Sequence, residues 1–510
     1  MTALGIIGVF LLLSLALGVL ARRGRPMSLE DWSVGGRGFG TIFVFLLMAG
    51  EIYTTFTFLG ASGWAYGNGA PAFYIPCYGA VAYAISYFLL PPIWRYATEH
   101  RLLSQADFFV SKYRSKSLGI VVSLVSIAAL LPYLVLQMKG LGIIISEASY
   151  GAISPALAIW VSTGVLVLYV IVSGVHGSAW TAVVKDVMIL GVVVTLGIYL
   201  PVHYYGGYRA MFATIERSQP AFLVLPTSGM SPTWLISTVL LSAFGFFMWP
   251  HSFASIYTAR SEQAFRRNAV IMPLYQLILV FVLFVGFVAL LQTPGLKGAD
   301  GDLALLRISK GTFSPAVVGV IGAAGLLTAL VPGSMLLIAV STILVQNVLR
   351  PAFPSLDSRM AAAVAKALVP VVAIIGVWLT LRPGNAVVPL LLMGYNLVTQ
   401  LFPLVVLALP QVPLASRTGA LVGIIAGEAT VAFFSLSGGT LATWFPSWPQ
   451  AITDINVGMI ALLVNVMVVT VVSLGTRKAF VAHEYATARA PRTVPRVGDA
   501  ASTSSSQVVN

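Results

Sequence analysis

Long apolar segments recur along the whole chain and constrain its fold more than any other feature. A helix needs about 20 apolar residues to cross the hydrocarbon core of a bilayer. Strands of a membrane barrel would instead show about 10 residues of alternating character. We therefore predict an all-α polytopic membrane protein with about 13 transmembrane helices, covering residues 3–20, 42–66, 72–93, 118–146, 155–173, 182–201, 232–258, 269–292, 314–347, 361–381, 387–409, 417–437 and 455–474.

The charged residues give the orientation of these spans. Only 9% of the residues are charged and the mean hydropathy is +0.92, whereas soluble proteins carry about 25% charged residues. Of the 29 Lys and Arg residues, 22 fall on one side of the predicted membrane, among them Lys185, six fall on the other, and Lys139 lies in a span. The richer side faces the cytoplasm, so the N-terminus is expected outside and the C-terminus inside. The net charge of +13 is thus a signal of topology, and no nucleic-acid partner is expected.

The segments group into a core with flanking helices. The first apolar segment has no basic residue before it, so we expect an uncleaved helix rather than a signal peptide. Short helices are expected in the loops at 99–116 and 298–310. We expect a peripheral first helix, a transport core made of two repeats, two further peripheral helices and a disordered cytoplasmic tail, at residues 1–22, 42–409 (repeats 42–201 and 232–409), 417–474 and 475–510.

Glu51 lies in the middle of an otherwise uncharged apolar stretch at 41–60. A carboxylate there costs a few kcal/mol on insertion scales, and intramembrane carboxylates face cavities, partners or ions. Gly50 precedes it and the hydroxyls of Tyr53, Thr54 and Thr57 follow. We interpret this stretch as a broken helix whose acid is an ion ligand, a proton acceptor or a group that pins the break.

A second interruption lies in the seventh span, where Gly245 is followed within a few residues by Trp249-Pro250-His251. Proline removes a helical hydrogen bond and clashes with the preceding turn. The second and seventh spans are five apart and cross in opposite directions. Two broken helices at corresponding positions of two halves indicate an inverted-repeat transporter, with freed carbonyls for a cation and half-helix N-termini for an anionic group.

Several motifs in order resemble the sodium/solute symporter family over residues 1–475. The matching segments are Leu29–Arg37, Phe58–Gly63, Gln105–Phe109 and Val184–Met188. The chain is also similar to the branch of bacterial monocarboxylate uptake permeases, at Gly50–Phe58, Leu131–Gln137, Trp249–Ser252 and Ala329–Gly333. The resemblance implies a LeuT-type core of five plus five helices, formed by the second to eleventh spans.

The resemblance also implies a sodium site, and here the chain departs from the family. The expected positions in the first broken helix are Gly50 and Tyr53, and the two hydroxyl positions fall on Leu330 and Val331, whose side chains cannot bind sodium. Ser334 lies one turn further and would serve after a shift in register. The resemblance therefore leaves Na⁺ and H⁺ both open as the coupling ion, and no other cofactor is expected.

Further candidates for the site follow from position and residue type. Asp186 matches a family acid of the inner ion path, and a salt bridge is the structural alternative. His251, Lys139, Trp249, Thr54 and Thr57 are candidates for contact with the solute. For these the alternatives are core packing, snorkelling of Lys139 to the interface, and local bonding of threonine hydroxyls to the backbone.

We therefore expect a transporter and not an enzyme, located in the bacterial inner membrane. The expected activity is cation-coupled symport of a small organic acid such as pyruvate or lactate, by alternating access. Sodium-coupled symport of an amino acid is the alternative, and a channel or a non-transport membrane protein is a more remote one. The sequence leaves the solute, the stoichiometry and the oligomeric state open.

Overall fold

The computed structural model describes residues 1–22, 28–382 and 386–489, and every regular element in these ranges is a helix. Ten helical segments are long and apolar enough to cross a membrane, and two bent pairs raise this number to 12. The unbroken segments run over Thr2–Leu20, Ala70–Glu99, Lys116–Ala148, Pro155–Tyr205, Gln263–Gln292, Pro315–Ala352, Ser358–Thr380, Val387–Ala408, Arg417–Ser437 and Val457–Thr476. The all-α prediction is confirmed.

Helix α8 (Pro155–Tyr205) contains two of the predicted spans. Its 51 residues would measure about 76 Å at 1.5 Å per residue, more than twice the hydrocarbon core of about 30 Å. The backbone leaves helical geometry at Gly174, with φ 57° and ψ −158°, between the predicted spans at 155–173 and 182–201. The total of 13 spans and their orientation stay predictions.

The two bent pairs are the broken helices expected from the sequence. One pair consists of α3 (Thr41–Ile52) and the segment Phe56–Asn68, which contains η2 and α4 (Ala61–Asn68), with a bend of 46°. The other joins Pro232–Met248, which contains α10 (Pro232–Gly245) and η4 (Phe246–Met248), to α11 (Pro250–Ile256), with a bend of 56°. Each pair opens one of the two predicted repeats.

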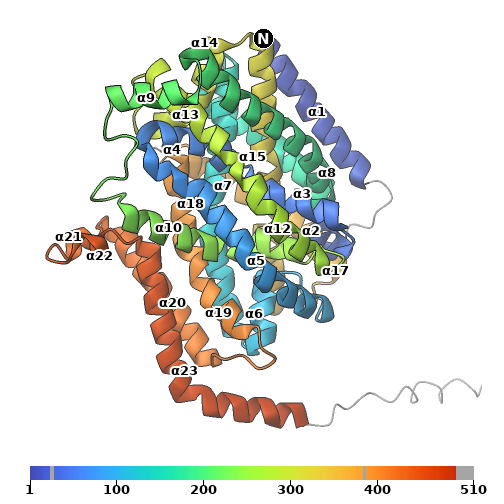
Figure 1. Cartoon of the computed structure of the whole chain (residues 1–510). Coiled ribbons are helices and arrows are strands. Elements are labelled where there is room, and N and C mark those ends of the chain that lie inside the picture. Colours follow the sequence, from blue (N-terminus) through green and yellow to red (C-terminus); the bar gives the residue numbers. More distant parts are fainter. Residues whose placement is uncertain (23–27, 383–385, 490–510) are drawn as a thin grey trace, which may run out of the picture.

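Helix α15 (Pro315–Ile343) is the central element of the fold. In an apolar 18-residue stretch of its span, 94% of the residues are buried. It packs against α1 (Thr2–Arg22), α7 (Lys116–Ala148), α8 and α17 (Ser358–Thr380). The helices α20 (Arg417–Ser437) and α23 (Val457–Arg489) pack mainly on each other at one edge of the molecule (Figure 1).

The remaining helices are short or complete the spans. The loop helices α6 (Gln105–Tyr113) and α14 (Ala304–Thr312) lie in the two loops where short helices were expected. The other principal helices are α2 (Leu29–Val34), α5 (Tyr74–Glu99), α9 (Tyr208–Ser218), α12 (Gln263–Leu277), α13 (Leu279–Gln292), α18 (Val387–Val398), α19 (Phe402–Ala408), α21 (Leu441–Trp444) and α22 (Gln450–Thr453).

The C-terminal boundary expected from the sequence was wrong. Helix α23 continues to Arg489, so residues 475–489 are helical and do not belong to a disordered tail. The polar, basic composition after Arg477 hid this continuation, because a span that leaves the bilayer can continue as a solvated helix. Residues 490–510 lie outside the described ranges.

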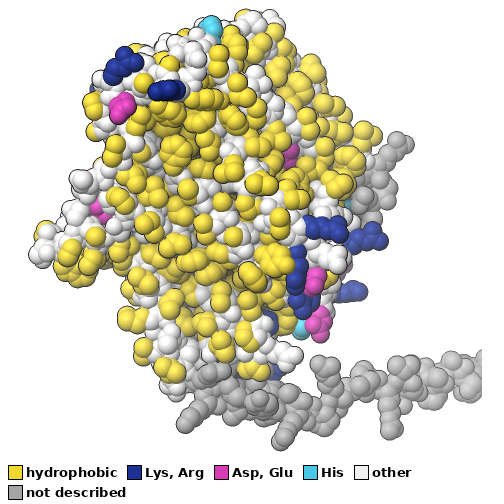
Figure 2. All heavy atoms as spheres, viewed as in Figure 1, with side chains coloured by type: hydrophobic (Ala, Val, Ile, Leu, Met, Phe, Trp, Pro, Cys, Tyr) yellow, Lys and Arg dark blue, Asp and Glu magenta, His cyan; other side chains and the backbone are white. Residues whose placement is uncertain are grey.

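The surface agrees with a membrane environment. Many large apolar side chains are exposed, such as Phe88 (77%) and Val187 (70%). Figure 2 shows apolar side chains over most of the visible face, with Lys and Arg gathered at the lower right and a smaller basic group at the upper left. Soluble monomeric proteins rarely expose apolar patches of this extent. In a bilayer, lipid covers such a surface and keeps it out of contact with water.

Candidate functional site

The break after α3 frees backbone carbonyls in the interior of the protein. Tyr53 leaves the helix with φ −88° and ψ 88°. The Thr57 hydroxyl donates to the carbonyl of Ile52 at 2.7 Å, and the Thr54 amide donates to the Thr57 hydroxyl at 2.9 Å. Thr54 and Thr57, proposed as contacts for the solute, therefore serve the backbone of the break, as hydroxyls in membrane helices commonly do.

The carbonyls of Gly50 and Tyr53 are bound by a lysine. Lys185 Nζ, from α8, donates to both carbonyl oxygens at 3.1 Å. The same ammonium lies 2.9 Å from Oδ1 of Asp186. The Lys185 side chain is fully buried, and that of Asp186 is 5% exposed. The expected place of Lys185 among the cytoplasmic cations is corrected by its buried position at the break, because α8 turns this residue inward.

Glu51 connects the two breaks. The hydroxyls of Ser252 and Ser255 on α11 lie beside its side chain, and Lys185 acts on it as a positive charge. Ser252 directly follows the Trp249-Pro250-His251 interruption. The predicted acid of the first broken helix thus contacts the second one, as the inverted-repeat interpretation expected.

The second break presents an aromatic cluster. Trp249 has extended backbone, φ −60° and ψ 132°, because a residue before proline avoids the helical region. Its ring lies 4.9 Å from that of Tyr133 and 5.3 Å from that of Tyr395. The rings of Tyr133 and His251 are 5.4 Å apart. Tyr133 also lies beside Thr54, so it reaches from one break to the other.

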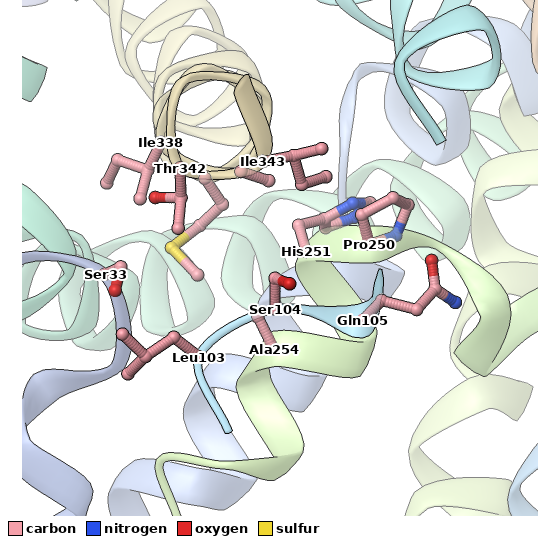
Figure 3. Close-up of a pocket in the computed structure, with 12 residues that line it drawn as sticks. Ser33, Leu103, Ser104, Gln105, Pro250, His251, Ala254, Ile338, Thr342 and Ile343 are labelled. Atoms are coloured by element: carbon pink, nitrogen blue, oxygen red, sulfur yellow. The ribbon is translucent and has the colours of Figure 1, made fainter. Parts of the chain in front are cut away.

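A small pocket adjoins His251 (Figure 3). It runs between α11, α15 and the start of α6, and its lining includes Ser104, Gln105, Ala254 and Thr342. Gln105 donates to the carbonyl of Met248, which holds the second break against α6. Ser104 and Gln105 belong to a segment between two spans that is predicted to face the cytoplasm, so the pocket lies toward that predicted side.

Several buried polar groups near the breaks have no hydrogen-bond partner among the described residues. They are Nδ1 of His251, the hydroxyl of Thr55 and both side-chain atoms of Gln137. Buried polar atoms are nearly always paired, so unpaired ones mark places where a ligand or water binds. Sequence reasoning missed Gln137, Thr55 and Tyr133; an amide one turn after Tyr133 in an apolar span was the available signal.

Two predicted residues are engaged elsewhere. Lys139 Nζ forms an ion pair of 2.9 Å with Asp302, whose carboxylate also accepts from the amide of Val387. The Ser334 hydroxyl donates to the carbonyl of Val331 at 2.6 Å and lies 2.7 Å from the hydroxyl of Ser178. The side chains of Lys139 and Ser334 are thus engaged by Asp302 and by Val331 and Ser178. The other predicted site residues lie at the two breaks: Glu51, Gly50, Tyr53, Asp186, His251, Trp249, Thr54 and Thr57.

The residues at the first break do not fit a sodium ion. Sodium binds oxygen ligands, but the ammonium of Lys185 already binds the carbonyl oxygens of Gly50 and Tyr53. The side chain of Val331 lies 4.0 Å from the position that a Cβ of Gly50 would take, so an apolar group faces the break from α15. Leu330 lines an apolar cavity together with Leu11 and Leu141.

Known proteins resemble this chain over nearly its whole length. The model of the sodium:solute symporter family matches residues 32–427. The uncharacterized symporter YhjB of Bacillus subtilis is 59% identical over 477 residues, which is 94% of this chain and 98% of that protein. A monocarboxylate transport permease protein of Rhizobium johnstonii is 27% identical over 491 residues, or 92% and 96% of the two chains.

The fold is also that of solved transporters. A Na⁺-coupled sialic acid symporter, in a substrate-bound outward-open state, superposes with a TM-score of 0.75 at 18% identity, covering 94% of this chain and 98% of that one. At this identity the likeness concerns the fold alone. It confirms the LeuT-type architecture expected for the two repeats.

Proposed function

Because the chain belongs to the sodium:solute symporter family, whose members are transporters and not enzymes, we propose that it imports a small monocarboxylate, coupled to a cation, across the bacterial plasma membrane. The contact between the two helix breaks carries this proposal. Glu51 of one break lies beside Ser252 and Ser255 of the other, and Tyr133 lies between Thr54 and His251. In inverted-repeat transporters, solute and ion bind where two such breaks meet.

The chemistry of the second break supports a small carboxylate with an apolar body. Trp249, Tyr133 and Tyr395 form an aromatic wall. His251 and Gln137 offer nitrogen atoms without partners among the described residues, and an N–H group of either side chain is a donor for a carboxylate. The likeness to a monocarboxylate transport permease supports the same solute class.

Transport follows from a relative movement of two groups of helices. The broken pairs, with α5 and the α12–α13 span, form the moving bundle, and α7, α8, α15 and α17 form the scaffold. Rocking of one against the other around the site exposes it to either side in turn. Cation and solute each favour binding of the other, since coupling between two sites is reciprocal.

Uptake by proteoliposomes tests this function. Purified protein is reconstituted and supplied with labelled pyruvate under an inward proton or sodium gradient. We expect accumulation above equilibrium that unlabelled lactate suppresses and unlabelled proline leaves unchanged. Suppression by proline alone would transfer the protein to the amino-acid alternative, and ion current without uptake would indicate a channel.

A histidine variant connects the assay to the site. We expect His251→Asn to raise the KM for pyruvate about tenfold, which corresponds to about 1.4 kcal/mol of lost binding, while kcat changes little because the loss concerns binding of the solute. His203→Asn, at an exposed position near the end of α8, is the matched control. An unchanged KM for His251→Asn would remove this residue from the solute site.

A further inference from the structure

The ammonium of Lys185 is enclosed by oxygen atoms of the protein. A lysine has three N–H donors, and Lys185 Nζ faces three oxygens: the carbonyls of Gly50 and Tyr53 at 3.1 Å and Oδ1 of Asp186 at 2.9 Å. Its side chain has no exposed surface. The ammonium is therefore a buried component of the break, bonded to both freed carbonyls and paired with a carboxylate.

A sodium ion and this ammonium compete for the same place. Both carry one positive charge, and both require the carbonyl oxygens that the break exposes. Two unit charges about 4 Å apart, at an effective dielectric constant of about 20, lower the affinity for the second cation by roughly a thousandfold. The α15 positions that would supply hydroxyls carry the apolar side chains of Leu330 and Val331 instead.

We propose that Lys185 is a tethered cation that replaces sodium at the break of α3, so that solute binding and translocation need no Na⁺. This inference rests on the proposed transport function and specifies its ion requirement. It departs from the sodium site that the family description implies.

The tether also joins the two moving parts of the transporter. Gly50 and Tyr53 belong to the broken helix of the bundle, whereas Lys185 and Asp186 belong to α8 of the scaffold. A bound ion would connect these parts only while it is present. A covalently attached ammonium is present throughout the transport cycle, and its affinity for the carbonyls does not depend on the external salt.

Counterflow of labelled pyruvate in proteoliposomes tests this proposal, because exchange needs no driving ion gradient. We expect equal rates in sodium chloride and in choline chloride. Exchange in sodium chloride alone would overturn the inference and leave the proposed function intact. Absence of exchange in both media would overturn the pyruvate assignment and, with it, the function on which the inference rests.

A second measurement uses the metal alone, without any solute. The melting temperature of the purified wild-type protein is expected to be the same in sodium chloride and choline chloride at equal ionic strength. A saturable rise with Na⁺ would contradict the replacement of sodium by Lys185. This readout remains decisive if the lysine variants fail to fold.

Variants of Lys185 give the complementary result. In choline chloride we expect Lys185→Ala to lose at least tenfold in counterflow rate, because two carbonyls and the Asp186 carboxylate lose their cation. Lys297→Ala, at an exposed loop position, is the control for loss of a positive charge elsewhere. Full counterflow by Lys185→Ala without sodium would show that the break needs no cation and would overturn the proposal.

Discussion

Two largely buried lysines of this protein each form an ion pair with an aspartate, and the pairing determines their cost in the membrane. Lys185 is matched by Asp186, and Lys139 by Asp302. An unpaired buried charge is strongly unfavourable, whereas a pair in good geometry is close to neutral. The side chains of Asp302 and Lys139 are 3% and 21% exposed, so this second pair is nearly as enclosed as the first.

The Lys139–Asp302 pair gives a prediction about stability. Removing one partner of a buried pair costs about 3–5 kcal/mol, so Lys139→Met is expected to lower the melting temperature in detergent clearly. The double variant Lys139→Met with Asp302→Asn is expected to recover most of the loss, since no charge is left unpaired. Equal melting temperatures of the single and double variants would contradict a role for the pair.

The same pair gives a pH dependence. Asp302 lies in the loop between two spans, and burial raises the pKa of its carboxyl, while Lys139 opposes the rise. Without Lys139 the fold favours the neutral acid more strongly, so stability is present at low pH and is lost as pH rises through the raised pKa. Melting curves between pH 5 and 8 should therefore show Lys139→Met approaching the wild type at the acidic end, and a deficit independent of pH would contradict this.

At the scale of the secondary-structure element, the interruptions of helices create the geometry of the proposed site. The breaks at Tyr53 and Trp249 turn the two helices by 46° and 56°, and the kink at Gly174 divides α8 into two spans. Two of the three have a local cause: Pro250 keeps Trp249 out of the helical region, and Gly174 adopts a positive φ that other residues rarely take. The break at Tyr53 has no proline, and tertiary bonds from Thr57 and Lys185 satisfy its carbonyls.

The kink in α8 is testable by adding a single methyl group. A Cβ on Gly174 would lie 2.7 Å from the Trp32 ring, and its φ of +57° is unfavourable for alanine. We expect Gly174→Ala to destabilise the protein by about 1–3 kcal/mol, measured by thermal unfolding. Gly164→Ala in the same helix, where a Cβ meets no atom within 4 Å, should be neutral or slightly stabilising. Equal effects of both changes would contradict this account.

At the scale of the whole molecule, the proposed site must become accessible in turn from each of the two faces of the transporter. The pocket beside His251 is lined from the predicted cytoplasmic loop, and Asn68 lies in a separate pocket on the predicted outer side. The distribution of Lys and Arg determines which face is which.

Cysteine labelling tests this orientation. Cys77, the one cysteine of the chain, is replaced by serine, and cysteine is then introduced as Ala254→Cys or Asn68→Cys. We expect a membrane-impermeant maleimide to label Ala254→Cys in inside-out vesicles and Asn68→Cys in intact cells. The reverse pattern would overturn the predicted topology.

The sequence by itself determined the all-α membrane class, both helix breaks and Glu51 as an acid at the first break. These follow from hydropathy, proline and glycine, which act locally and leave a signal in any linear reading. Tertiary structure decided which side chains meet: Lys185 rather than a metal at the carbonyls of Gly50 and Tyr53, and Asp302 rather than a solute beside Lys139. Such pairings join residues more than 130 positions apart, and only the packing of α8 and α7 against distant segments brings them within bonding distance.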